Sequence, residues 1–295
     1  MKLKHFNITS PGTSPPENEG WEPTWYGYYE MTKCETPDRR KEYLENDREI
    51  HAKGMLTEAD FERECLLNIL ADIDKEDVTM FELGAGWGRM SMALAGTIDF
   101  QIIPLQIKTY RCLAVEAEPV HFQWTEEHFE KQGINATAIH VAVSDKGGYC
   151  RFNASLNPKT CYGQAINTLF LNNWIPNIGG IMNFFSRKTI RVPAFTIDQL
   201  MKNFKFDHVN IIDIDVQGAE FEVVSGAVNS IRNHQIDYWL IGTHNSILND
   251  KIAELLETDY ELIVNLYPNN IGRIDGFNPV DCHDGIQLFR SKNLP

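Results

Sequence analysis

Two polar side chains in the second half of the chain have the chemistry of a proton-transfer site. Asp215 directly follows an apolar stretch at residues 209–214, and His244 comes soon after another at residues 238–241. Histidine often accepts a proton near neutral pH, while a carboxylate orients the imidazole or holds the hydrogen of an acceptor hydroxyl. We therefore expect Asp215 and His244 to be catalytic residues, and the sequence leaves open which of them is the base.

The same region allows two other interpretations. Asp215, His244 and Asn245 would be the ligands of a divalent cation that lowers the pKa of an acceptor hydroxyl. Asp213 precedes Asp215 by two positions, so strand alternation places both carboxylates on one side of a sheet, which favours a cation or raises one pKa. Alternatively, Asp215 caps a helix and His244 is a packing residue. We prefer the metal-free base and expect no resident metal.

Three glycines mark a ligand-binding turn near residue 85. Gly84, Gly86 and Gly88 follow an apolar stretch at residues 78–83 and precede an amphipathic helical pattern that begins at Met90. Glycine is needed in such a turn because the backbone bends sharply and no Cβ blocks a ligand lying against it. We therefore predict that this loop binds a cofactor.

Composition limits the class of protein. The chain has 295 residues, 43% of them hydrophobic, with a formal net charge of −14 and no evident cluster of Lys and Arg. It can bury a large core, and its acidity argues against a nucleic-acid partner. The six cysteines are scattered without a C-x-x-C pair. Since no apolar signal segment and no run of transmembrane length is present, we expect a cytoplasmic protein with reduced thiols and no membrane contact.

Alternating strand and helix patterns predict the scaffold that positions these side chains. The expected strands are residues 78–83, 112–115, 137–143, 209–214, 238–241, 261–266 and 286–289. Strands that alternate with helices form a mainly parallel sheet covered by helices on both faces. Ligands bind such sheets beyond the carboxyl ends of the strands, where Glu82, Glu116, Asp145, Asp215 and His244 would meet.

Two segments fall outside this alternation. We expect residues 1–56 to form an N-terminal arm and residues 57–295 to form the domain. Five aromatic residues lie within residues 21–29, and such a density predicts docking onto the domain or onto a second subunit, so a homodimer is one expectation. The alternative is that the aromatic residues line an acceptor site. Residues 149–195 are rich in Asn, Gly and Pro and are predicted to be an irregular substrate or lid segment.

The glycine loop distinguishes between two cofactors. A nicotinamide-binding turn has the pattern G-x-G-x-x-G, and here Arg89 takes the place of the third glycine. Glu82 would repel a pyrophosphate but attract the sulfonium and ammonium groups of S-adenosylmethionine (SAM). Glu116 offers a carboxylate to two ribose hydroxyls, and Asp145 can accept from the adenine amino group. The predicted cofactor-binding residues are Glu82, Gly84, Ala85, Gly86, Gly88, Glu116, Ala117, Ser144 and Asp145.

Four stretches in the expected order resemble the FkbM family of class I SAM-dependent methyltransferases. They are residues 81–88, 114–119, 141–147 and 211–220. The resemblance implies a Rossmann-like, seven-stranded sheet whose last strand is antiparallel. It also implies O-methylation of a hydroxyl on a sugar or secondary metabolite, that is, a small-molecule or saccharide acceptor. The chain departs from the family in having Asp213 where Lys is usual and Gln217 where Glu is usual.

The two alternative functions are an NAD-dependent oxidoreductase and a non-catalytic SAM-binding scaffold protein. An NAD-dependent oxidoreductase requires the third glycine, which the chain lacks. A SAM-binding scaffold protein without catalysis would not need to keep Asp215 and His244.

Overall fold

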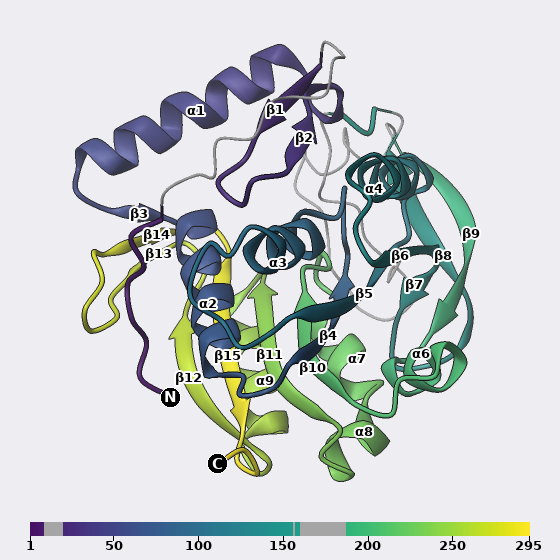
Figure 1. Cartoon of the computed structure of the whole chain (residues 1–295). Coiled ribbons are helices and arrows are strands. Elements are labelled where there is room, and N and C mark those ends of the chain that lie inside the picture. The colour runs from purple at the N-terminus through teal and green to yellow at the C-terminus, as the bar shows by residue number, and fades with distance from the viewer. Residues whose placement is uncertain (9–19, 156, 160–186) are drawn as a thin grey trace.

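A seven-stranded sheet forms the centre of the computed structural model, which describes residues 1–8, 20–155, 157–159 and 187–295 (Figure 1). The strand order is β12-β15-β11-β10-β4-β5-β6, and the pairs from β11 to β6 are parallel. β15 runs antiparallel to both of its neighbours. The predicted Rossmann-like sheet is therefore confirmed. Its strands are β4 (Asp77–Leu83), β5 (Thr109–Glu116), β6 (Ala136–His140), β10 (Val209–Ile214), β11 (Ile236–Thr243), β12 (Tyr260–Leu266) and β15 (Gly285–Ser291).

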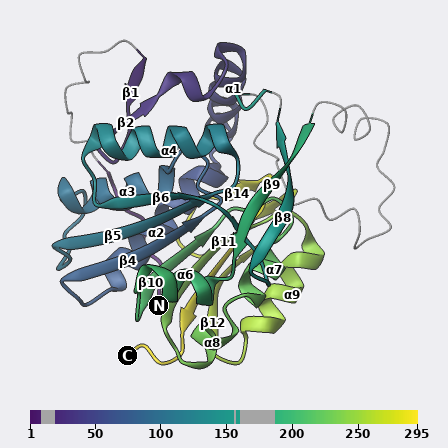
Figure 2. The same cartoon turned by 90° about the vertical axis from the view of Figure 1, so that its right-hand side faces the viewer.

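Helices cover both faces of the sheet because successive strand residues point to opposite sides. In β4, Met80 lies in one hydrophobic core and Phe81 in the other. The first core is closed by α2 (Glu58–Asp72), α3 (Arg89–Asp99) and α4 (Pro119–Gln132). The second is closed by α6 (Ile197–Phe204), α7 (Glu220–Ser225), α8 (Val228–Arg232) and α9 (Ser246–Leu256) (Figure 2). In the described part of the chain, no helix is both long and apolar enough to cross a membrane.

The N-terminal arm packs against the α3 and α4 side of the domain. It consists of β1 (Trp21–Pro23), β2 (Tyr29–Met31), the short 3₁₀ helix η1 (Thr32–Cys34) and α1 (Pro37–Ala52). Tyr26 is 1% exposed, and a Cβ built on Gly96 of α3 would lie 2.1 Å from its carbonyl oxygen. The Met31 amide donates a hydrogen bond of 3.0 Å to Nε2 of His128. The predicted docking of the aromatic segment onto the domain is confirmed.

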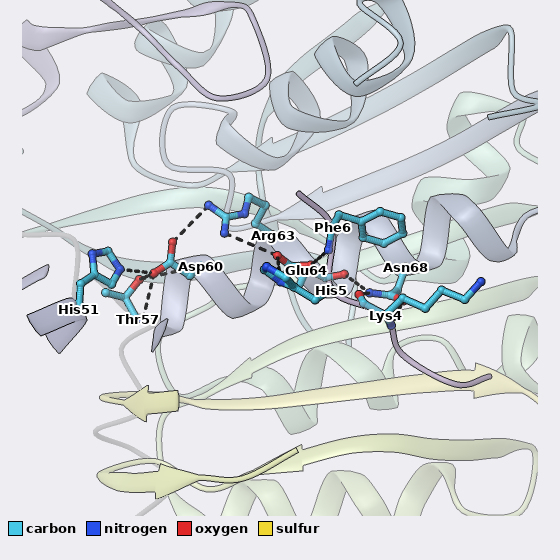
Figure 3. Close-up of polar contacts among 9 residues, drawn as sticks. All are labelled: Lys4, His5, Phe6, His51, Thr57, Asp60, Arg63, Glu64 and Asn68. Atoms are coloured by element: carbon cyan, nitrogen blue, oxygen red, sulfur yellow. Dashed lines mark hydrogen bonds and ion pairs between the residues drawn. The ribbon is translucent and has the colours of Figure 1, made fainter. Parts of the chain in front are cut away.

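Residues 1–8 run along one face of α2 (Figure 3). The Lys4 amide donates to Oδ1 of Asn68 at 2.7 Å, and the Asn68 amide donates back to the Lys4 carbonyl at 2.8 Å. The Phe6 amide donates to Oε2 of Glu64 at 3.1 Å. Residues four apart on a helix share a face, so the chain terminus occupies the side that carries Asn68 and Glu64. The opposite side of α2 is left for the cavity described below.

The segment predicted to be irregular is regular at both ends. β8 (Gly148–Ser155) pairs antiparallel with β9 (Arg187–Phe195), and β7 (Ala142–Val143) pairs with β9. The prediction for these ends is wrong because Phe152, Ala154, Val192 and Ala194 bury one face at the two-residue period of a strand, between polar neighbours that hide the pattern. Residues 160–186 lie outside the described residues, and so does the expected lid.

A small sheet connects the start of α2 to the last part of the chain. β3 (Leu56–Thr57) pairs parallel with β14 (Val280–Cys282), which pairs antiparallel with β13 (Asn270–Gly272). The segment after β14 is thereby placed beside the first turn of α2, although more than two hundred residues separate them in sequence. The division of the chain at residue 56 stays a prediction.

Candidate active site

A cavity of about 1280 Å³ lies beyond the carboxyl ends of β4, β5 and β10. The glycine loop and the ends of these strands line one part of it. Side chains from α1, from the first turns of α2 and from the segment after β14 line the rest. A cavity therefore lies at the edge of the sheet where the sequence predicts a ligand site, and the N-terminal arm contributes to its wall.

Close packing and an open cavity explain two of the loop glycines. Gly84 has φ 86°, and a Cβ there would lie 2.1 Å from the carbonyl oxygen of Asp215, so the loop rests directly on the end of β10. Gly86 has φ 59°, and a Cβ there would meet no atom within 4 Å, because this residue borders the cavity. Positive φ disfavours any side chain at both positions. Gly88 precedes the first residue of α3.

Glu82 holds the start of α3 against β4. It is 3% exposed, and its Oε1 accepts from the Met90 amide at 2.9 Å. Its Oε2 accepts from the Ser91 amide at 3.0 Å and from the Ser91 hydroxyl at 2.5 Å. Burial raises the pKa of Glu82, and these hydrogen bonds oppose that rise. Glu82 lines the cavity, but both carboxylate oxygens already have partners, so direct contact with a cofactor cation stays a prediction.

Glu116 joins the end of β5 to the glycine loop. Its Oε2 accepts from the Gly86 amide and its Oε1 from the Glu118 amide, both at 2.7 Å. It is 7% exposed, and burial raises its pKa to about 7 despite these bonds. Ala117, the next residue, also lines the cavity. Both oxygens of Glu116 thus have backbone partners, and its role toward a ribose stays a prediction.

Ser144 and Asp145 are predicted to bind the cofactor, but neither residue lines the cavity. Asp145 is exposed, 3.4 Å from the Lys146 ammonium, and it accepts from the Ser144 hydroxyl at 3.2 Å. The chain leaves the cavity here because β7 pairs with β9, and the Ser144 amide donates to the Phe195 carbonyl at 3.0 Å. The three residues before them, Val141, Ala142 and Val143, line the cavity instead.

The structure brings the two predicted catalytic residues together. Nε2 of His244 lies 3.7 Å from Oδ1 of Asp215 and 3.6 Å from Oδ2 of Asp284. Asp215 is 59% exposed and lines the cavity, while His244 is 14% exposed behind it. Its other ring nitrogen, Nδ1, is hydrogen-bonded to the fully buried carboxylate of Glu220. Glu220 belongs to the first turn of α7, and no local pattern in the sequence singles out Asp284.

The charge of His244 argues against its use as the base. Burial lowers the pKa of the imidazole, but the hydrogen bond and charge of Glu220, with the charges of Asp215 and Asp284, raise it to about 9. The ring is therefore protonated at neutral pH. Nε2 of His244 also lies 2.6 Å from Nε2 of Gln217. Two N–H groups cannot bond to each other, so a protonated imidazole requires the Gln217 amide to be assigned in the flipped orientation, with its oxygen as the acceptor.

Asp213 occupies the floor of the cavity beside Glu82. The two residues are register partners on β10 and β4, and Asp213 is 7% exposed. Burial and the charges of Glu82, Glu62 and Asp215 raise its pKa well above the usual range of a carboxyl group. As strand alternation predicted, Asp213 and Asp215 both face the cavity.

The alternative metal site is not assembled as the sequence suggested. Oδ1 of Asn245 accepts from the Leu248 amide at 3.0 Å, so this side chain caps α9. Among the residues that the structure describes, no group of three or more His, Cys, Asp and Glu side chains is arranged to hold a metal ion.

A protein-family model described as "Methyltransferase FkbM domain" matches residues 104–262, more than half of the chain. The chain belongs to the FkbM methyltransferase family. SAM-dependent methyl transfer is thus its class of reaction, in place of the NAD-dependent oxidoreductase alternative. The matched part of the FkbM domain holds Glu116, Asp215 and His244, while the glycine loop precedes it.

Two solved methyltransferases are similar to this chain at low sequence identity. Precorrin-6y C5,15-methyltransferase from Geobacter metallireducens GS-15 is 12% identical, with a TM-score of 0.41, over 78% of this chain and 87% of that one. An rRNA methylase from Streptococcus thermophilus is 9% identical, with a TM-score of 0.41, over 79% and 95% of the two chains. No curated protein matches the sequence of this chain.

Proposed function

We propose that the protein transfers the methyl group of SAM to a hydroxyl oxygen of a small-molecule or saccharide acceptor. The observation that carries this proposal is one continuous cavity that joins the glycine loop and Glu116 to Asp215. At about 1280 Å³ it exceeds the roughly 300–1,000 Å³ of ordinary small-ligand pockets, so it has room for a cofactor and an acceptor.

The residues at the glycine loop fit the cofactor. Gly86 leaves the loop backbone open to the cavity, and the buried carboxylate of Glu116 stands beside it for the ribose hydroxyls. Ala85 and Ala117 are small, line the same part and leave space for the adenosine. When bound, SAM supplies an electrophilic methyl group on its sulfonium.

Asp215 is the proposed proton acceptor, and His244 its positioning residue. A protonated imidazole has no free lone pair on either nitrogen, so His244 does not accept the proton of the hydroxyl at neutral pH. Its positive charge, 3.7 Å from Asp215, favours the ionised form of that carboxylate. Asp215 is also the more accessible of the two, since it faces the cavity.

Binding and turnover measurements test this function separately. We expect SAM and its product S-adenosylhomocysteine (SAH) to raise the melting temperature, whereas NAD leaves it unchanged. We expect methyl transfer from radiolabelled SAM onto hydroxylated small molecules, with Asp215→Asn lowering kcat by roughly 100-fold or more at unchanged SAH affinity. Stabilisation by SAM and SAH without turnover on any polyol would instead favour the scaffold protein.

Location and partners complete the proposal. We place the enzyme in the cytoplasm because the five described cysteines are free thiols. We propose no nucleic-acid partner, since the formal net charge is −14 and the cavity is rich in carboxylates. A homodimer stays a prediction that light scattering of the full chain tests.

A further inference from the structure

Asp213 is a buried carboxyl group that has no partner within the described chain. It is 7% exposed, belongs to β10 and borders the cavity. Among residues 1–8, 20–155, 157–159 and 187–295, its side chain makes no hydrogen bond and no ion pair. A buried carboxylate without a partner is unfavourable unless a ligand satisfies it. The position therefore points to a ligand group that enters the cavity.

The charged groups around Asp213 favour a positively charged ligand group. The nearby carboxylates are those of Glu82, Glu62 and Asp215. The Arg89 guanidinium also acts on Asp213, but it lies 2.8 Å from Glu62 and is paired with it. Both oxygens of Glu82 accept hydrogen bonds from the start of α3. The negative potential at Asp213 thus attracts a cation, and its free oxygens require a hydrogen-bond donor.

The strand order places Asp213 across the glycine loop from Glu116. β4, which leads into the loop, lies between β10 and β5. Asp213 is the register partner of Glu82, which in turn pairs with Ala114 of β5, two residues before Glu116. Neighbouring strands are about 4.8 Å apart, so roughly 10 Å separate β10 from β5. A ligand whose ribose binds Glu116 and that crosses the loop therefore brings its other end over β10.

The amino-acid end of SAM carries the kind of group that this position lacks. Its α-ammonium combines a positive charge with three N–H donors. The sulfonium has the charge but no N–H or O–H donor, so it cannot satisfy the oxygens of a buried carboxylate. Hydrogen bonds between an ammonium and a carboxylate are among the strong ones in proteins. The ammonium is therefore the part of the cofactor that fits Asp213.

We propose that Asp213, and not Glu82, binds the ammonium group of the methionine moiety of SAM. The inference rests on the proposed function. Glu82 is then a positioning residue that fixes the start of α3 and the loop before it. Asp213 is the contact that selects a cofactor with an amine. Because SAH keeps this amine, Asp213 recognises SAH in the same way as SAM.

Calorimetry on the full chain measures the contribution of the amine. The probes are SAH and its deamino analogue, in which hydrogen replaces the α-ammonium while the thioether and the carboxylate are kept. We expect SAH to bind the wild type about tenfold or more tightly than the analogue. Equal affinities would overturn this inference alone, whereas absence of SAH binding contradicts the proposed function.

Substitutions assign the amine preference to one carboxylate. In the nearly isosteric Asp213→Asn, we expect the advantage of SAH over the analogue to fall to about threefold or less. Asp281→Asn makes the same change elsewhere on the cavity wall, and Glu254→Gln removes an exposed carboxylate of α9. Both controls should keep the wild-type advantage. An advantage that survives in Asp213→Asn, or that is lost equally in Asp281→Asn, overturns the assignment.

Thermal unfolding without ligand provides a readout that does not depend on the cofactor. Since Asp213 has no partner among the described residues, Asp213→Asn removes a buried charge and breaks no contact. We expect the melting temperature of this variant to equal or exceed that of the wild type. A lower melting temperature would show that the carboxylate supports the fold, and it would contradict the proposed role as a ligand contact.

Discussion

His244 donates a hydrogen bond from Nδ1 to the buried carboxylate of Glu220, which links the end of β11 to the first turn of α7. Oε1 of Glu220 also accepts a hydrogen bond from the Gly218 amide at 2.9 Å. This second bond fixes the orientation of the carboxylate toward the imidazole. A fully buried negative charge beside an imidazole stabilises the imidazolium. The contact therefore decides the charge of His244, and it leaves Asp215 as the side chain that accepts a proton.

Replacing Glu220 with Gln tests this relationship. The pKa of His244 is about 9 in the folded state against an ordinary value of 6.5. A raised histidine pKa contributes stability that is fully present below about 6.5 and is lost as the pH rises toward 9. We expect Glu220→Gln to flatten this decline in the free energy of unfolding, measured by urea denaturation across that range. An equally steep decline in the variant would contradict the assignment. Glu254→Gln serves as the control.

The pH dependence of cofactor affinity tests Glu116. Burial raises the pKa of this carboxyl from 4.5 to about 7. The folded protein therefore binds this proton more tightly than the unfolded chain, and Glu116 makes folding less favourable as the pH rises from about 4.5 to about 7. Ribose hydroxyls donate best to the ionised form, so SAH affinity should increase through about pH 7.

We expect Glu116→Gln to weaken SAH binding by roughly 10- to 100-fold and to remove most of this pH dependence. Calorimetric titrations with SAH at several pH values measure both effects. An affinity that is independent of pH in the wild type would show that Glu116 does not bind the ribose in its ionised form.

Two glycine substitutions in one loop should have different consequences. In Gly84→Ala the new Cβ would lie 2.1 Å from the Asp215 carbonyl oxygen, so we expect the melting temperature to fall by several degrees or more. In Gly86→Ala the Cβ meets no protein atom within 4 Å and projects into the cavity. That variant should lose only the roughly 1–3 kcal/mol of backbone strain, fold, and bind SAH poorly. Thermal unfolding with and without SAH separates the two effects, and a Gly86→Ala protein with wild-type SAH affinity would contradict the loop assignment.

Acid should release the N-terminal arm through His128. Burial lowers the pKa of this histidine from 6.5 to about 4, and its neutral Nε2 accepts from the Met31 amide. A depressed histidine pKa means that stability present above about 6.5 is lost as the pH falls toward 4, up to about 3 kcal/mol. The protection of residues 20–35 against hydrogen exchange, relative to the intrinsic rate at each pH, should therefore fall over this window.

A matched variant keeps a hydrogen-bond acceptor at position 128 but removes the titratable imidazole. His128→Gln should hold the arm with little change in this protection as the pH falls, while His234→Gln, at an exposed position, should behave as the wild type. Protection of the arm that does not respond to acid in the wild type would show that His128 is not the residue that holds the arm.

The sequence by itself determined the scaffold and the class of reaction. The strand, the glycine turn and the helix around Gly84 are specified by residues within a few positions of one another. Alternating apolar stretches specify a mainly parallel sheet in the same local way. The strand-end positions of Glu116, Asp215 and His244 followed from this pattern, because parallel strands end at one edge of the sheet.

Only the tertiary structure decided how these side chains are used. In the folded chain, both carboxylate oxygens of Glu82 accept hydrogen bonds from the start of α3. The pairing of β7 with β9 keeps Ser144 and Asp145 out of the cavity wall, and Glu220 is hydrogen-bonded to His244. The tertiary structure also brought the first turn of α2 beside Asp284 through the pairing of β3 with β14. Charge state, burial and hydrogen-bond partners depend on contacts between segments far apart in the chain, and no local pattern contains them.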